Sequence, residues 1–316
     1  MSTMRKWTIG VVLLSAAIGG ASCSHGITDA QAKAAGAEAT AAAEARLFTA
    51  MNRDNFDSAG EIISTLIDLR NKYPTNYRNT FILGAANFWW IAEAQRTDAE
   101  ISPLLIVSLA IPNILGPFSD VISNDPVNRG GADGLLGAFL SDASLDKVTG
   151  AALVDSATIY APQVGLFQQM SIRRFAVFSD TSTAQAIEWG FKWWEWCLGS
   201  PIDRTNPDFT GKVKPPTDGP MGFCWGSARV PHGFEGAWMM FGDLLVKGGQ
   251  FTAARRAYLN AQLGVNYSTW KHSPDLEARL ASDFNQRYAT YANTDPARWA
   301  PIGNTTYGCT QCHASK

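Results

Sequence analysis

The sequence AWMMFGDLLVKGGQFTAARRAYLNA, residues 237–261, decides the fold. Its apolar residues recur every three or four positions on either side of Gly248 and Gly249, which is typical of two amphipathic helices joined by a tight turn. Small residues at Gly242 and Ala254 would let the two helices approach closely, because no bulky side chain separates their backbones. The stretch therefore predicts an antiparallel helix pair.

The same periodicity extends over most of the chain. Residues 56–74 place five aliphatic side chains along one helical face, and strand patterns are scarce. Short Gly, Pro or Asp breaks separate the periodic segments, which is typical of neighbouring antiparallel helices. The sequence therefore predicts an all-α fold. Further periodic segments lie at residues 81–96, 152–160, 164–178, 182–197 and 275–292.

The spacing within residues 237–261 resembles a tetratricopeptide repeat. Trp238 precedes the small Gly242 on the first helix, and Ala254 and Tyr258 follow on the second. Residues 56–84 carry a looser version of the pattern, and residues 164–197 a weaker one. The resemblance implies an irregular α-solenoid of helix pairs over residues 45–300, in which the stacking of successive pairs builds a continuous core.

The first 22 residues resemble an export signal. Arg5 and Lys6 precede an apolar run at residues 7–18 that is short for a bilayer span, and small residues follow it. Cys23 then stands where a bacterial lipoprotein carries its lipidated cysteine, although Gly20 occupies a position at which that motif usually has leucine. We expect a signal peptide at residues 1–22, lipidation at Cys23 and an Ala-rich segment at residues 23–44. Cleavage near Ser22 without lipidation and a retained membrane anchor are the alternatives.

The composition agrees with an exported, folded protein. Apolar residues make up 46% of the chain and charged residues 17%, so a sizeable core can be buried. The net charge is −2 and no basic stripe occurs, which argues against nucleic acid as a partner. Together with the signal and Cys23, this predicts a protein of the periplasm or outer membrane that is attached to the membrane by a lipid anchor.

Cysteine use also favours an oxidising compartment. The chain has five cysteines, and lipidation of Cys23 would leave four. Cys197 and Cys224 are the expected disulfide partners, with two buried thiols as the alternative. Closing a loop of this length would stabilise the fold by about 3 kcal/mol.

Two segments interrupt the helical pattern. Residues 199–233 lack helical periodicity, and so long a loop in a compact domain is usually functional or disordered. Residues 102–118 are strongly apolar but contain three prolines, which predicts a buried helix, with a membrane-contacting insertion as the alternative. A tryptophan cluster precedes the long loop, and we interpret it as hydrophobic core, with a ligand platform as the alternative. Its members are Trp189, Trp193, Trp194 and Trp196.

The segment CTQCH, residues 309–313, has the Cys-x-x-Cys-His order that attaches haem in c-type cytochromes. Two thiols one short turn apart reach the two vinyl groups of one haem, and the adjacent imidazole faces the iron. We expect one covalent haem c on Cys309 and Cys312, within a tail at residues 301–316, and His313 as the proximal iron ligand. The alternatives are a Cys309–Cys312 disulfide and a zinc site that would need a fourth ligand.

No separate cytochrome domain surrounds the motif, so a second axial ligand would come from the helical body or from another molecule, or would be absent. His232 is the first candidate and His272 the second, since imidazole is a preferred ligand of haem iron. The other residues considered are Met221, Met239, Met240 and, beside the expected anchor, His25.

These features predict an exported monohaem c-type cytochrome on a helical-repeat scaffold, which transfers electrons with a protein partner. The alternative is a non-enzymatic, tetratricopeptide-like envelope lipoprotein that binds a protein or peptide, with its C-terminal cysteines as a disulfide or metal clasp. A catalytic haem with an open coordination site is a variant of the cytochrome prediction. The sequence contains no hydrolase or phosphate-loop motif, so no catalytic residue is assigned and an electron carrier or scaffold is favoured over an enzyme.

Overall fold

The computed structural model describes residues 29–97, 111–142, 146–174, 180–291 and 309–316. Helices dominate these residues, and the extended pairing among them is an isolated bridge between Trp270 and Ser315. This confirms the all-α prediction. In the described part of the chain, no helix is both long enough and apolar enough to cross a membrane. The expected signal peptide, Cys23 and His25 lie outside the described residues.

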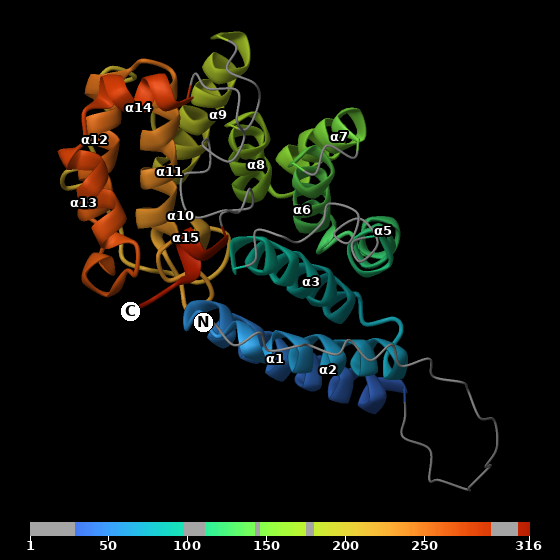
Figure 1. Cartoon of the computed structure of the whole chain (residues 1–316). Helices are drawn as coiled ribbons and strands as arrows, with labels where there is room; N and C mark the ends of the chain where they lie inside the picture. The colour runs from blue at the N-terminus through green and yellow to red at the C-terminus, as the bar shows by residue number, and fades with distance from the viewer. Residues whose placement is uncertain (1–28, 98–110, 143–145, 175–179, 292–308) are drawn as a thin grey trace, which may run out of the picture.

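Three helices form the N-terminal part of the molecule (Figure 1). Helices α1 and α2 lie side by side, and α3 packs against both. Ile62 and Leu66 of α2 are buried and Ile63 and Leu69 pack beside them, whereas Ile67, expected on the same face, is 40% exposed. The bounds are α1 Asp29–Asn52, the 3-10 turn η1 Phe56–Ser58, α2 Ala59–Lys72 and α3 Tyr77–Thr97.

In the middle of the chain, η2, α5 and α6 pack against α3, and α7 packs against α6. Phe118 on α5 lies against Gly84 on α3, where an added Cβ would be 2.8 Å from the phenyl ring. Asp146 caps α7 by accepting a hydrogen bond from the backbone N–H of Thr149 at 3.0 Å. The bounds are the π-helical turn η2 Ile111–Leu115, α5 Gly116–Asn124, α6 Arg129–Asp142 and α7 Lys147–Tyr160.

The apolar segment at residues 102–118 is described from residue 111 onward. Ile114, Pro117 and Phe118 are buried there, as expected of a helix inside the core. Residues 98–110 lie outside the described part of the chain.

The C-terminal half contains a large hydrophobic cluster and is drawn from yellow-green to red in Figure 1. Helix α8 packs against α9, and α11 packs against α12. Helix α11 is buried along its whole length, because other elements surround it. The bounds are α8 Pro162–Arg174, α9 Asp180–Leu198, α10 Gly222–Trp225, α11 Gly233–Lys247, α12 Phe251–Gln262, η3 Tyr267–Thr269, α13 Ser273–Ala281, α14 Phe284–Tyr291 and α15 Cys309–His313.

Helices α11 and α12 form the pair that residues 237–261 predict. The turn between them contains Gly249, whose φ of 72° lies in the left-handed region that glycine adopts readily. An added Cβ at Gly242 would lie 2.3 Å from the ring of Tyr258, so a larger residue there would force the two helices apart. The small Gly242 and the large Tyr258 of the sequence pattern therefore contact each other where α11 and α12 pack together.

The long loop after α9 is held at two points. A disulfide joins Cys197 to Cys224, the pair that the sequence indicates. Asn260 on α12 anchors the other side, since its Oδ1 accepts a hydrogen bond from Phe209 N at 3.1 Å and its amide donates to the Pro207 carbonyl. These contacts keep the loop against the body of the protein.

The tryptophan cluster is part of the hydrophobic core. Trp193 and Trp194 are fully buried, and Trp194 stacks on Trp238 with ring centroids 4.0 Å apart. Phe209 from the long loop packs edge-on against the same Trp194 at 5.4 Å. Aromatic contacts of this kind add to the stability that burial alone provides.

Asp243 on α11 is a buried carboxylate that joins four helices. It accepts hydrogen bonds from Tyr258 on α12 at 2.7 Å, from Arg279 on α13 at 2.9 and 3.1 Å, and from Arg287 on α14. Burial alone raises the pKa of Asp243, but the two guanidinium groups outweigh burial, and the pKa lies below its usual value. The carboxylate is therefore ionised at neutral pH.

Candidate functional site

The Cys-x-x-Cys-His segment forms the short helix α15, which is docked into the body of the protein. It lies between α11 and the C-terminal end of α1 (Figure 1). Backbone hydrogen bonds connect α15 and the residues that follow it to these elements and to the turn before α13. In each pair the N–H of the first residue donates to the carbonyl oxygen of the second. The pairs are His232 to Cys312 at 3.0 Å, Lys271 to Ala314 at 3.2 Å, Ser315 to Asn52 at 2.9 Å and Lys316 to Thr269 at 2.8 Å.

Gln311 anchors the middle of α15. Its side chain is buried and donates a hydrogen bond to the Gly236 carbonyl at 2.7 Å. The indole N–H of Trp270 donates to the Gln311 carbonyl at 2.8 Å. Both bonds are shielded from water, so breaking either would leave a buried polar group without its partner.

Cys312 faces helix α11. Its sulfur packs against Gly236, where an added Cβ would lie only 2.7 Å from the sulfur and 2.7 Å from the Gln311 carbonyl oxygen. Glycine at position 236 therefore permits the close approach of α15 to α11. Cys309 begins α15, and its side chain lies outside the described residues.

His313 faces helix α1. Its Nδ1 lies 3.1 Å from Asn52 Oδ1, and its ring stacks on Phe48 with centroids 6.1 Å apart. Burial lowers the pKa of His313 to about 4; a hydrogen bond to the Arg229 backbone opposes this shift, and nearby His232 adds to it. The imidazole is thus neutral at neutral pH, which is the form that binds metals.

A cavity of about 410 Å³ opens beside His313, at the junction of the N-terminal helices with the long loop. This volume lies within the range of small-molecule and cofactor sites. The wall is mostly apolar and aromatic and includes two arginines. The lining side chains that matter for its chemistry are Phe48, Met51, Arg78, Phe81, Phe88, Trp89, Phe223, Arg229 and His313.

The two histidines expected at the second axial position lie outside this cavity wall. His232 is fully buried, and its Nε2 lies 2.9 Å from Ser315 Oγ. Burial, with a smaller effect of His272, lowers the pKa of His232 to about 4. His272 Nδ1 lies 2.8 Å from the Asp275 carboxylate. Met239 and Met240 are buried in α11, whereas Met51 lines the cavity.

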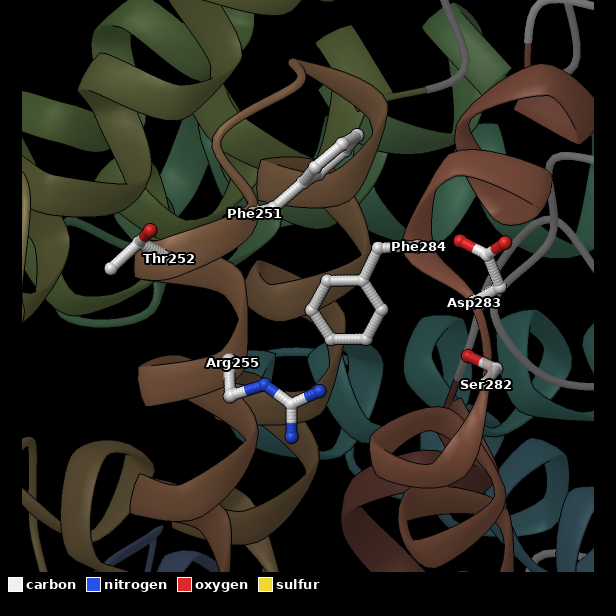
Figure 2. A pocket seen from close by; sticks show the side chains of 6 residues that line it. All are labelled: Phe251, Thr252, Arg255, Ser282, Asp283 and Phe284. Atoms are coloured by element: carbon white, nitrogen blue, oxygen red, sulfur yellow. The ribbon is translucent and has the colours of Figure 1, made fainter.

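A second hollow lies between α12 and the start of α14 (Figure 2). Its volume is about 400 Å³. Two of its polar side chains have partners within the fold: Ser282 donates to the Arg279 carbonyl at 2.7 Å, and Asp283 accepts from Asn285 N at 2.8 Å. The Arg255 guanidinium lies 5.3 Å from the centre of the Phe284 ring. We therefore place the candidate site at His313 and not here.

Comparison of the chain with protein-family models, curated proteins and solved structures finds no match. The roles of these residues therefore follow from their own geometry and chemistry. Among the described residues, no group of three or more His, Cys, Asp or Glu side chains is arranged to hold a metal ion. The zinc alternative thus has no support from the described side chains, although that of Cys309 is not among them.

Replacing Gly236 with alanine is expected to displace α15 and to cost about 1–3 kcal/mol, the usual penalty for overpacking. The added methyl group would overlap both the Cys312 sulfur and the Gln311 carbonyl oxygen. The measurement is amide hydrogen exchange at His232, whose N–H bonds to the Cys312 carbonyl, together with urea unfolding. Gly60→Ala is the control, because a Cβ there meets no atom within 4 Å. Unchanged protection of the His232 amide in Gly236→Ala would contradict the packing described.

Proposed function

We propose that this protein carries one c-type haem, attached at Cys309 and Cys312 with His313 as proximal ligand, and that it exchanges electrons with a protein partner. The observation that supports this most is the position of His313, whose neutral imidazole lies in the wall of a cavity of about 410 Å³ with aromatic sides. When bound, haem supplies one-electron redox chemistry. The chain would hold the group, exclude water from it and fix the proximal imidazole.

Asn52 suits the role of a partner behind the proximal histidine. Metal-binding histidines usually donate their second ring N–H to a neighbouring acceptor, which fixes the tautomer and the ring orientation. In the tautomer with the proton on Nδ1, His313 donates to Asn52 Oδ1 and carries the lone pair of its neutral imidazole on Nε2. Phe48 stacks on the same ring and limits its rotation.

Cys312 fits the proposal only with a local rearrangement. Its sulfur packs against Gly236 on α11 and does not line the cavity. Attachment at Cys312 therefore requires the sulfur to leave this contact. Because α15 has only five residues, we propose that this helix turns when haem is attached and that the hydrogen bonds of residues 314–316, which follow it, keep His313 near the cavity.

The scaffold in this proposal is an irregular solenoid of tetratricopeptide-like helix pairs, exported and anchored through a lipid on Cys23. The close contact between Gly242 and Tyr258 supports the repeat-like character of the α11–α12 pair. The sequential packing of α8 with α9 and of α6 with α7 agrees with it. Such a scaffold would present the haem to a redox partner.

The decisive experiment is an absorption spectrum of the protein from a host that matures c-type haem. We expect one haem per chain that stays attached after denaturation in acid acetone, since thioether bonds survive unfolding. A colourless protein from such a host would overturn the proposal.

The second axial ligand gives a separate prediction. His232 and His272 remain candidates, but Met51 is the cavity-lining thioether, so we expect Met51→Leu to convert a low-spin spectrum to high-spin. Leucine has nearly the same volume, and packing should change little. His232→Ala is the comparison, with the low-spin spectrum expected to persist. The reverse outcome would assign the position to His232, and a high-spin spectrum that binds carbon monoxide in the unaltered protein would indicate an open, catalytic or ligand-binding iron.

A scaffold whose tail acts as a clasp is the second candidate function. The backbone hydrogen bonds from residues 312–316 connect the end of α1 with the regions before α11 and α13, which supports a structural role for the tail. This candidate predicts that the tail holds the two halves together without haem. Removal of residues 309–316 should then lower the unfolding midpoint of the haem-free protein.

A further inference from the structure

We propose that Arg78 and Arg229 form a carboxylate-binding site in the wall of the His313 cavity and that they receive the two propionate groups of the haem. This inference rests on the proposed function, because it takes the cavity to be the place of the haem. It adds two residues that have no role in attachment or iron ligation.

The charges around the cavity support an anionic occupant. Arg78 and Arg229 both line the cavity, and no carboxylate is among the described residues of its wall. Glu44 on α1 lies behind them and contacts both guanidinium groups, at 3.0 Å from Arg229 Nη2 and at 3.0 Å from Arg78 Nε. One carboxylate shared by two guanidinium groups leaves an excess of one positive charge beside an apolar cavity.

The two arginines retain donors for a ligand. A guanidinium group has five N–H donors, and Arg78 uses three of them on Glu44 and Asn128. Arg229 contacts Glu44 through one nitrogen, and its side chain is 58% exposed. Guanidinium groups bind carboxylates in a paired, planar geometry, which makes them suited to a ligand with two carboxylates.

Arg229 is connected to the proximal histidine through one aromatic ring. The Arg229 guanidinium lies 5.8 Å from the centre of Phe48, and Phe48 stacks on His313. The Arg78 guanidinium lies 5.2 Å from the centre of Phe81, another cavity residue. We infer that a haem bound by His313 in this cavity would have its acidic edge within reach of the two cations, which line the same wall.

The test uses the full chain with Cys309→Ala and Cys312→Ala, so that haem binds without covalent attachment. Haemin and haemin dimethyl ester are titrated separately, and the Soret band and the tryptophan fluorescence are followed, since Trp89 lines the cavity. We expect haemin to bind at least tenfold more tightly than the ester, because charge-assisted hydrogen bonds of about 1.5–3 kcal/mol correspond to a tenfold or larger difference. His313→Ala in the same background should remove the coordinated Soret band, which would place the bound haemin at the cavity.

Arg229→Gln in this background should weaken haemin binding about tenfold and leave the affinity for the ester unchanged. Arg46→Gln is the matched control, because Arg46 lies on α1, pairs with Glu61 and does not line the cavity. Dodecanoate serves as the third probe. Equal binding of haemin and its ester, failure of both to bind, or tighter binding of dodecanoate than of haemin would each overturn the propionate assignment. Covalent haem in the unaltered chain is measured separately, so failure of the proposed function is distinguished from failure of this inference.

Discussion

Replacing Cys309 and Cys312 with alanine is expected to abolish covalent haem attachment completely, because no thiol would remain to form a thioether bond. The helical content should stay nearly unchanged. The buried hydrophobic clusters consist of residues from other helices, so the body has its own core without α15. The measurements are haem content after acid acetone extraction and far-ultraviolet circular dichroism.

His313→Ala is the companion variant, because it keeps both thiols. We expect thioether bonds to form in it while axial coordination weakens. Loss of helical structure together with loss of haem in the double cysteine variant would mean that the haem is part of the core. The picture of a haem-binding segment docked on a finished scaffold would then be wrong.

Asp243→Asn is expected to lower the free energy of unfolding by about 3–5 kcal/mol, as when one partner of a buried ion pair is removed. Asparagine has the same size but no charge, so Arg279 and Arg287 would lose the carboxylate that both of them contact. Urea unfolding monitored by tryptophan fluorescence gives the difference. Asp218→Asn is the control, since Asp218 is exposed in the long loop and should change stability by less than about 0.5 kcal/mol.

The pH dependence of the same variant checks the cause. The pKa of Asp243 is lowered in the folded protein, so its contribution is present above the unfolded value of about 4 and is lost as the pH falls through the lower folded value. The stability difference between the unaltered protein and Asp243→Asn should therefore shrink in acid. A difference that persists unchanged at low pH would point to packing instead of charge.

The sequence was most informative where contacts are local. The α11–α12 pair follows from residues 237–261, because both helices and their small contact residues lie in one short stretch. Cys197 and Cys224 could be paired because the expected roles of the other three cysteines left these two, in a chain expected to be exported. Periodicity was least informative in α1, which begins at Asp29 and includes most of the segment described from the sequence as Ala-rich. Alanine favours helices but marks no apolar face.

The cavity could not be predicted from the sequence. Asn52 contacts His313 across 261 residues, and neither an asparagine nor a phenylalanine in an alanine-rich helix carries a signal for such a contact. Arg78, Arg229 and Met51 come to the same wall from α3, the long loop and α1. The preference of haem iron for imidazole ligands instead suggested His232 and His272, and both lie outside the cavity wall.

The contact between Asn52 and His313 also has a consequence for the order of folding. Closing a loop of this length costs more entropy than forming any helix pair, so this contact should appear after both halves have collapsed. In the proposed function, haem attachment before this contact forms would reach Cys312 before its sulfur packs against Gly236.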